Sequence, residues 1–192
     1  MPFDINPEIS KASTLPKEFY LDHQYFEFCH ENIFPNSWQL VADKRILQNN
    51  NIYPLTFLPN FVNEPLVLIN QDNDINCFSN VCTHRAHLVV NKPHSGSKLR
   101  CMYHGKTFNL DGSFNSMLGF ENTENFPTEK DNLQPIPIKR WKNFIFVSLS
   151  GEINIMPALN DVEKRLPLYP FEDLIYDENN SKSWEIDAHC AL

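Results

Sequence analysis

The sequence predicts a mainly β protein, a small antiparallel β-sandwich or barrel preceded by an N-terminal helical lead-in. Short runs that are apolar at alternate positions, or apolar throughout, recur between residues 51 and 149. Clusters of Asn, Asp, Gly and Pro separate these runs, as turns do. The segment before them instead has the three-, four- and seven-residue apolar spacing of a helix.

The first regular element is expected to be a helix from about residue 22 to residue 33. Its apolar residues fall on one helical face, and Asp22 has the side chain of an N-cap. Pro35 forbids continuation of the helix. Residues 1–14 show no periodicity and are expected to form an irregular arm, whereas residues 37–41 begin an extended run.

Strands are expected from residue 52 onward. The polar residues 70–74 form a turn between two of them, and Asp111-Gly112 is a strong signal for a two-residue hairpin. The strand that begins at residue 75 leads directly into Cys82. The expected strands are 52–58, 64–69, 75–78, 88–90, 107–110, 113–114, 135–138 and 144–149.

Two short motifs combine cysteine with histidine. They read Cys82-Thr83-His84-Arg85 and Cys101-Met102-Tyr103-His104-Gly105, with a sixteen-residue spacer after His84. A [2Fe-2S] cluster held by two Cys and two His takes one of each from two facing loops. A structural zinc site more often takes its ligands as like pairs. The pattern therefore favours a cluster held by Cys82, His84, Cys101 and His104 over zinc or chance.

These motifs resemble those of the α subunits of Rieske non-haem iron oxygenases, the ring-hydroxylating and choline-monooxygenase-like enzymes. In that family the first motif is usually followed by Gly and the second by Trp, whereas this sequence has Ala86 and Lys106. The resemblance implies a Rieske-type β domain with a helical lead-in. It also implies a [2Fe-2S] cluster held by the thiolates of Cys82 and Cys101 and the imidazoles of His84 and His104.

The resemblance further implies a function. The cluster would transfer single electrons within a monooxygenase or dioxygenase that hydroxylates an organic substrate, using O2 and electrons from NAD(P)H. A ferredoxin or a flavin reductase would be the electron donor, and the full-length family member would be a homotrimer. Family members bind a mononuclear non-haem Fe(II) in a C-terminal catalytic domain. The sequence contains no D-x-x-H-x4–5-H pattern for that iron, so no catalytic residue is assigned.

The resemblance sets the expected organisation of the chain. A helix stopped by Pro167 is expected over residues 158–166, and alternation over residues 183–192 predicts a half-buried strand. The chain is expected to be an N-terminal fragment that is not catalytically complete. The alternatives are a stand-alone Rieske ferredoxin-like carrier and a zinc-binding interaction module. The expected domains are 1–50 (arm and lead-in helix), 51–150 (Rieske [2Fe-2S] domain) and 151–192 (linker and truncated start of an α+β catalytic domain).

Composition limits the partners. The 192 residues carry a formal charge of -8, which argues against nucleic acid or an anionic membrane surface. No apolar run approaches the ~20 residues of a membrane span, and residues 1–6 lack the features of a secretory signal. Cys29, Cys77 and Cys190 have no disulfide-framework spacing and are expected to be buried thiols. Together these features predict a cytoplasmic protein.

Two further expectations concern the cluster's surroundings. The segment 82–110 contains no Asp or Glu, and its basic residues predict a positive surface for an acidic electron donor. Solvated loop charges without a partner are the alternative. Phe108 stands where some relatives have Tyr, and loss of that hydroxyl predicts a potential towards the lower part of the Rieske range. The basic residues are Arg85, Lys92, Lys98, Arg100 and Lys106.

Overall fold

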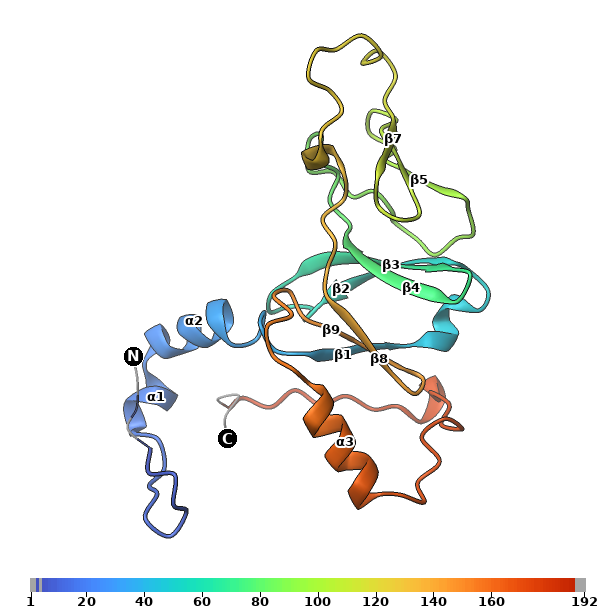
Figure 1. Ribbon diagram of the computed structural model, residues 1–192. Helices are drawn as coiled ribbons and strands as arrows, with labels where there is room; N and C mark the ends of the chain where they lie inside the picture. The colour runs from blue at the N-terminus through green and yellow to red at the C-terminus, as the bar shows by residue number, and fades with distance from the viewer. Residues whose placement is uncertain (1–2, 4, 189–192) are drawn as a thin grey trace. The chain divides into compact units, whose positions relative to one another are not determined.

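The computed structural model describes residue 3 and residues 5–188 (Figure 1). Residues 35–176 form one compact unit, and the described residues before 35 and after 176 form another. The larger unit holds both cysteine–histidine motifs. The domain limits drawn from the sequence, at residues 50 and 150, stay a prediction.

The smaller unit contains the lead-in helix. Helix α2 (His23–Asn32) matches the predicted segment, and the Asp22 carboxylate accepts a hydrogen bond from the Gln24 backbone N–H at 3.2 Å. This is the expected N-cap. The preceding helix α1 (Lys17–Leu21) was not predicted, because five residues are too few to show a helical period. Residues 5–14 contain no helix or strand, as expected.

The strand predicted over residues 183–192 is wrong for the part that can be compared. Residues 183–188 form no strand, and Trp184 and Ile186 are 77% and 80% exposed. A strand needs a neighbour for its backbone hydrogen bonds, and no strand of the described residues pairs with this segment. The rest of the prediction, including Cys190, lies outside the described residues. A short 3-10 helix, η3 (Glu178–Asn180), precedes the segment.

The larger unit is built from three antiparallel sheets of three strands each, which confirms the mainly β prediction. The strand orders are β1-β9-β8, β2-β3-β4 and β5-β6-β7. Figure 1 shows β2-β3-β4 between the other two sheets. The strands are β1 (Gln39–Asp43), β2 (Ile52–Phe57), β3 (Glu64–Gln71), β4 (Asp74–Ser79), β5 (Lys98–Arg100), β6 (Thr107–Asn109), β7 (Phe114–Ser116), β8 (Ile138–Trp141) and β9 (Phe144–Val147).

Strand β3 separates two hydrophobic cores. Leu66 and Leu68 point into a core shared with β8 and β9, while Val67 and Ile69 point into a core shared with the cysteine-bearing loops. All four side chains are fully buried. Successive side chains of a strand face opposite sides of its sheet, so a strand covered on both sides is apolar without interruption. The middle sheet therefore provides a rigid base for the loops.

Two strand predictions in the larger unit need correction, and one of its strands was missed. The segment 88–90 forms only an isolated bridge, Leu88 with Val81, because the side chain of Asn80 takes the backbone bonds of Val90. The segment predicted from residue 135 becomes a strand only at Ile138, since proline has no N–H for the ladder. Strand β5 was not predicted at all.

The remaining helices connect or follow the sheets. Helix α3 (Met156–Arg165) confirms the prediction and ends before Pro167. Two 3-10 helices are η1 (Lys44–Leu47) and η2 (Glu129–Asp131). None of the helices in the described part of the chain has both the length and the apolar character that crossing a membrane requires.

Candidate metal centre

Two loops with the same backbone plan carry the motifs. Loop 1 (Cys82–His87) follows β4, and loop 2 (Cys101–Lys106) joins β5 to β6. In each loop the cysteine N–H donates to the carbonyl of the last loop residue, at 2.8 Å in loop 1 and 2.9 Å in loop 2. The cysteine carbonyl accepts from the N–H four residues later, at 3.0 Å in both. The loops thus present cysteine and histidine from similarly closed turns.

The structure brings the four predicted ligands together. Cys82 and Cys101 are 3% and 2% exposed and lie in the same hydrophobic core. The rings of His84 and His104 face each other with centroids 4.9 Å apart and planes 74° apart. His84 is half-buried and His104 is exposed. The cysteines therefore lie at the core end of the site and the histidines nearer the surface.

The surroundings alter the proton affinity of both ligand types. Burial raises the pKa of the Cys82 thiol, although the backbone N–H of His84 hydrogen-bonds to the sulfur and opposes this effect. Burial also lowers the pKa of His84, and positive charge on His104, Arg85 and Lys106 acts in the same direction. A lowered pKa favours neutral imidazole, which is the form that binds metals.

This donor set fits a two-iron cluster. The four side chains form two pairs, sulfur with sulfur and imidazole with imidazole, as a cluster with Cys on one iron and His on the other requires. Nowhere in the described part of the chain do three His, Cys, Asp or Glu side chains converge as a single-ion site needs.

Asn80 supports loop 1 and was not singled out from the sequence. Its buried side chain donates to the Val90 carbonyl at 2.7 Å and accepts from the Val90 N–H at 2.9 Å. Its backbone N–H donates to the Pro65 carbonyl at 2.8 Å, which ties the loop to β3. Asn80 is only two residues before Cys82, but pairing with Val90 depends on the path of the chain, and sequence spacing does not reveal it.

Four of the five residues that were predicted to form a basic surface are exposed, and docking of an acidic electron donor there stays a prediction. Arg85, Lys92, Lys98 and Arg100 are exposed. Lys106 was also predicted there, but it is 1% exposed and forms a buried ion pair with Asp131. An acidic partner far along the chain allows this lysine to be buried.

The other described cysteines agree with the prediction. Cys29 and Cys77 are both buried, and burial raises the pKa of Cys77 to about 12. Such a thiol stays protonated and unreactive at neutral pH. Cys190 lies outside the described residues.

Ala86 of loop 1 has a backbone conformation that favours glycine. Its φ is +51°, and the matching residue of loop 2 is Gly105, with φ +76°. A side chain at positive φ strains the backbone, so Ala86→Gly is expected to stabilise the protein by about 0.5–1 kcal/mol. Denaturant unfolding measures this change. Ala158→Gly in helix α3 is the matched control and is expected to destabilise the protein by about 1 kcal/mol. If both variants changed the free energy of unfolding in the same direction, backbone strain at Ala86 would be contradicted.

Cysteine–histidine loops of this kind on a small antiparallel β domain define a Rieske-type iron–sulfur protein. The family model described as the Rieske [2Fe-2S] domain matches residues 37–127. The chain therefore carries a Rieske [2Fe-2S] domain, and the proteins that it resembles are oxygenase subunits. These comparisons support the iron–sulfur interpretation of the motifs over the zinc interpretation.

The similar proteins are oxygenase subunits. The carnitine monooxygenase oxygenase subunit of Escherichia coli (strain K12) is 34% identical over 167 residues, which are 86% of this chain and 42% of that protein. The glycine betaine monooxygenase oxygenase subunit of Pseudomonas aeruginosa (strain UCBPP-PA14) is 32% identical over 171 residues, 88% of this chain and 38% of that protein. The chain thus spans less than half the length of either relative.

A solved structure agrees with these relatives. The apo form of CntA, a quaternary ammonium Rieske monooxygenase, superposes with a TM-score of 0.69 at 30% identity. The match covers 81% of this chain and 45% of that one.

Proposed function

We propose that Cys82 and Cys101 hold one iron of the [2Fe-2S] cluster and that His84 and His104 hold the other. The observation that carries this proposal is the meeting of the two loops, with both thiols buried in one core and the imidazole ring centroids 4.9 Å apart. Cys82 would hold iron as the thiolate and would lose its thiol proton on binding, whereas the lowered pKa of His84 already favours the neutral imidazole.

When bound, such a cluster supplies reversible one-electron transfer at a potential between about −150 and +300 mV. The chain excludes water from the sulfur end of the site, where both cysteines pack in a core with Val89, Val90 and Phe108. His104 is exposed and gives a partner access to the opposite end. Phe108 has no hydroxyl to donate to a sulfur, so the expected potential is in the lower part of the range.

We propose further that the domain supplies electrons within an oxygenase that hydroxylates an organic substrate. The relatives named for carnitine and glycine betaine, and the structure of a quaternary ammonium monooxygenase, support a small quaternary ammonium substrate. Electrons would come from NAD(P)H through a ferredoxin or flavin reductase in the cytoplasm, and the full-length protein would be a trimer. A related structure is described as revealing inter-subunit electron transfer, which supports an oligomer. No residue of this chain is proposed to bind the mononuclear iron.

The cluster assignment is tested on protein purified without oxygen. It is expected to be red-brown, with two irons and two sulfides per chain, and to give the electron paramagnetic resonance (EPR) signal of a reduced Rieske centre. Potentiometric titration is expected to place its potential in the lower half of the stated range. Colourless protein with one zinc per chain would overturn the assignment. In the full-length oxygenase with its reductase, carnitine or glycine betaine should stimulate NAD(P)H oxidation, and an aromatic hydrocarbon should not.

A further inference from the structure

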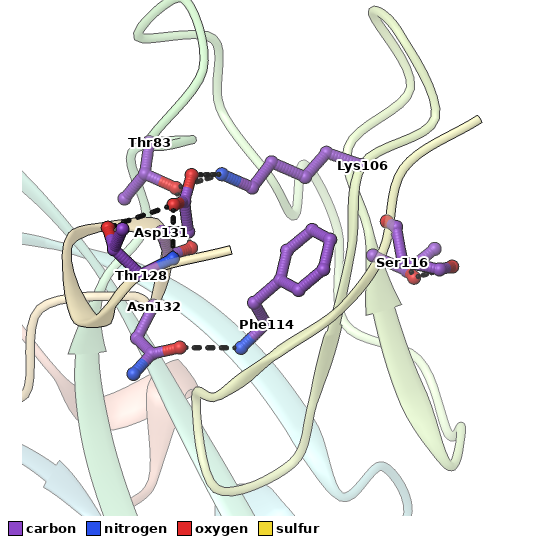
Figure 2. A network of polar contacts seen from close by, with 8 residues as sticks. Thr83, Lys106, Phe114, Ser116, Thr128, Asp131 and Asn132 are labelled. Atoms are coloured by element: carbon purple, nitrogen blue, oxygen red, sulfur yellow. Dashed lines mark hydrogen bonds and ion pairs between the residues drawn. The ribbon is translucent and has the colours of Figure 1, made fainter. Parts of the chain in front are cut away.

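Lys106 is a buried lysine directly beside the candidate cluster site. Its side chain is almost fully buried, and its Nζ lies 2.9 Å from Asp131 Oδ1 and 2.8 Å from Thr83 Oγ1 (Figure 2). The ammonium also lies 5.4–5.8 Å from the centroids of three aromatic rings, those of Phe108, Phe114 and Phe126. Its charge is therefore held in one place and shielded from solvent.

The contacts of Lys106 join three separate segments. Thr83 lies between the two candidate ligands of loop 1, Lys106 ends loop 2, and Asp131 belongs to η2. The Thr83 hydroxyl donates to the Asp131 carbonyl at 2.8 Å while it accepts from Lys106. The Asp131 carboxylate also accepts from the Thr128 backbone N–H at 2.9 Å. This network positions the two loops against each other.

The surroundings of Asp131 favour its charged form. Burial disfavours the Asp131 carboxylate, but hydrogen bonds from Thr128 and Lys106 outweigh this, so the pKa of Asp131 is lowered. The ammonium of Lys106 lies 2.8 Å from the hydroxyl of Thr83, the residue between Cys82 and His84 in loop 1. Apolar residues of similar volume often stabilise a fold as well as a buried ion pair does. Stability alone therefore does not account for a buried pair at this place.

We propose that the Lys106–Asp131 ion pair sets the reduction potential of the [2Fe-2S] cluster, with Lys106 raising the potential and Asp131 lowering it. This inference rests on the proposed cluster ligands. Reduction adds one negative charge to the cluster, which a nearby cation stabilises and a nearby anion destabilises. The Lys106 side chain is 2% exposed and that of Asp131 is 18% exposed, so solvent screens both charges less than it screens charges on the surface. Lys106 and Asp131 are positioning residues, because they act on the cluster through their charges and through the loops.

Because Lys106 and Asp131 carry opposite charges, removing one or the other is expected to shift the reduction potential in opposite directions. Lys106→Met removes the cation while keeping the length of the chain, and Asp131→Asn removes the anion while keeping an acceptor for Lys106. The potential of each purified, cluster-loaded variant is measured by EPR-monitored titration at one pH. Lys106→Met is expected to disfavour reduction about tenfold, a shift of about 59 mV downward. Asp131→Asn is expected to shift the potential upward, and the double variant to lie between the two single variants.

Two further variants separate charge from packing. Lys106→Arg keeps the charge and is expected to stay near the wild-type potential. Lys92→Met removes a charge of the same sign from an exposed position and is expected to shift the potential much less, because water and salt screen it.

The outcomes decide between the two proposals. Single variants that shift the potential in the same direction, or not at all, would overturn the role of the ion pair. If Lys106→Met fails to load a cluster, the other two variants decide. A reduction potential above wild type in Asp131→Asn, together with a wild-type potential in Lys106→Arg, would support the proposal. Any other result would overturn it. Wild-type protein without a [2Fe-2S] cluster would instead overturn the proposed function.

Discussion

Protein in which serine replaces Cys101 is expected to be colourless and to contain no [2Fe-2S] cluster. A thiolate is a soft ligand suited to iron–sulfur clusters, whereas a serine hydroxyl remains protonated at neutral pH. Cys101 is buried in the same core as Cys82, so no other side chain is expected to replace it there. Iron and sulfide analysis with visible absorption spectroscopy measures the loss.

Cys77 offers a matched control. It lies in β4 and is equally buried, but it packs in the core on the other side of the middle sheet. Cys77→Ala is therefore expected to lose some stability and to keep a full cluster. Normal cluster content in Cys101→Ser, or loss of the cluster from folded Cys77→Ala, would contradict the ligand assignment. His84→Ala and His104→Ala are expected to lose the cluster as well.

Gly112→Ala is expected to destabilise the protein by about 2–5 kcal/mol. Gly112 has a φ of +80°, and a Cβ built there would lie 2.4 Å from the nearest carbon of the Phe78 ring. Phe78 belongs to the core that holds both candidate cysteines, so neither the ring nor the turn can move freely. Backbone strain of ~1–2 kcal/mol and overpacking of ~1–3 kcal/mol combine at this position. Chemical denaturation followed by circular dichroism measures the effect.

Gly119→Ala measures the cost of backbone strain without overpacking. Gly119 has a similar φ of +84°, but a Cβ there would meet nothing within 4 Å. It is expected to destabilise by only ~1–2 kcal/mol. Equal losses in the two variants would mean that the Phe78 contact contributes nothing.

Local patterns predicted the elements whose cause is local. The N-cap of α2 depends on Asp22 and Gln24, and the apolar run of β3 reflects burial on both faces. Strand β5 was not predicted because it has only three residues, with Leu99 buried between two exposed basic residues. Alternation over residues 183–188 predicted a strand, but alternation does not supply the neighbouring strand that one requires.

In the candidate site, too, local spacing predicted some residues and missed a contact between distant ones. Cysteine and histidine lie two or three residues apart in each motif, so spacing alone identified them. Lys106 was placed on the surface because its partner, Asp131, is 25 residues away in the sequence. Contacts across such a separation leave no periodic trace, and only the path of the chain reveals that a charge there is neutralised.

The hydrogen bonds that close both loops have a consequence for how the cofactor is acquired. Each turn is fixed by its own main chain, and Asn80 fastens the first one to the sheet below. Small zinc domains fold only as their metal binds. The bonds that close these two loops use no cysteine or histidine side chain, so we expect both loops to form before iron and sulfide are inserted.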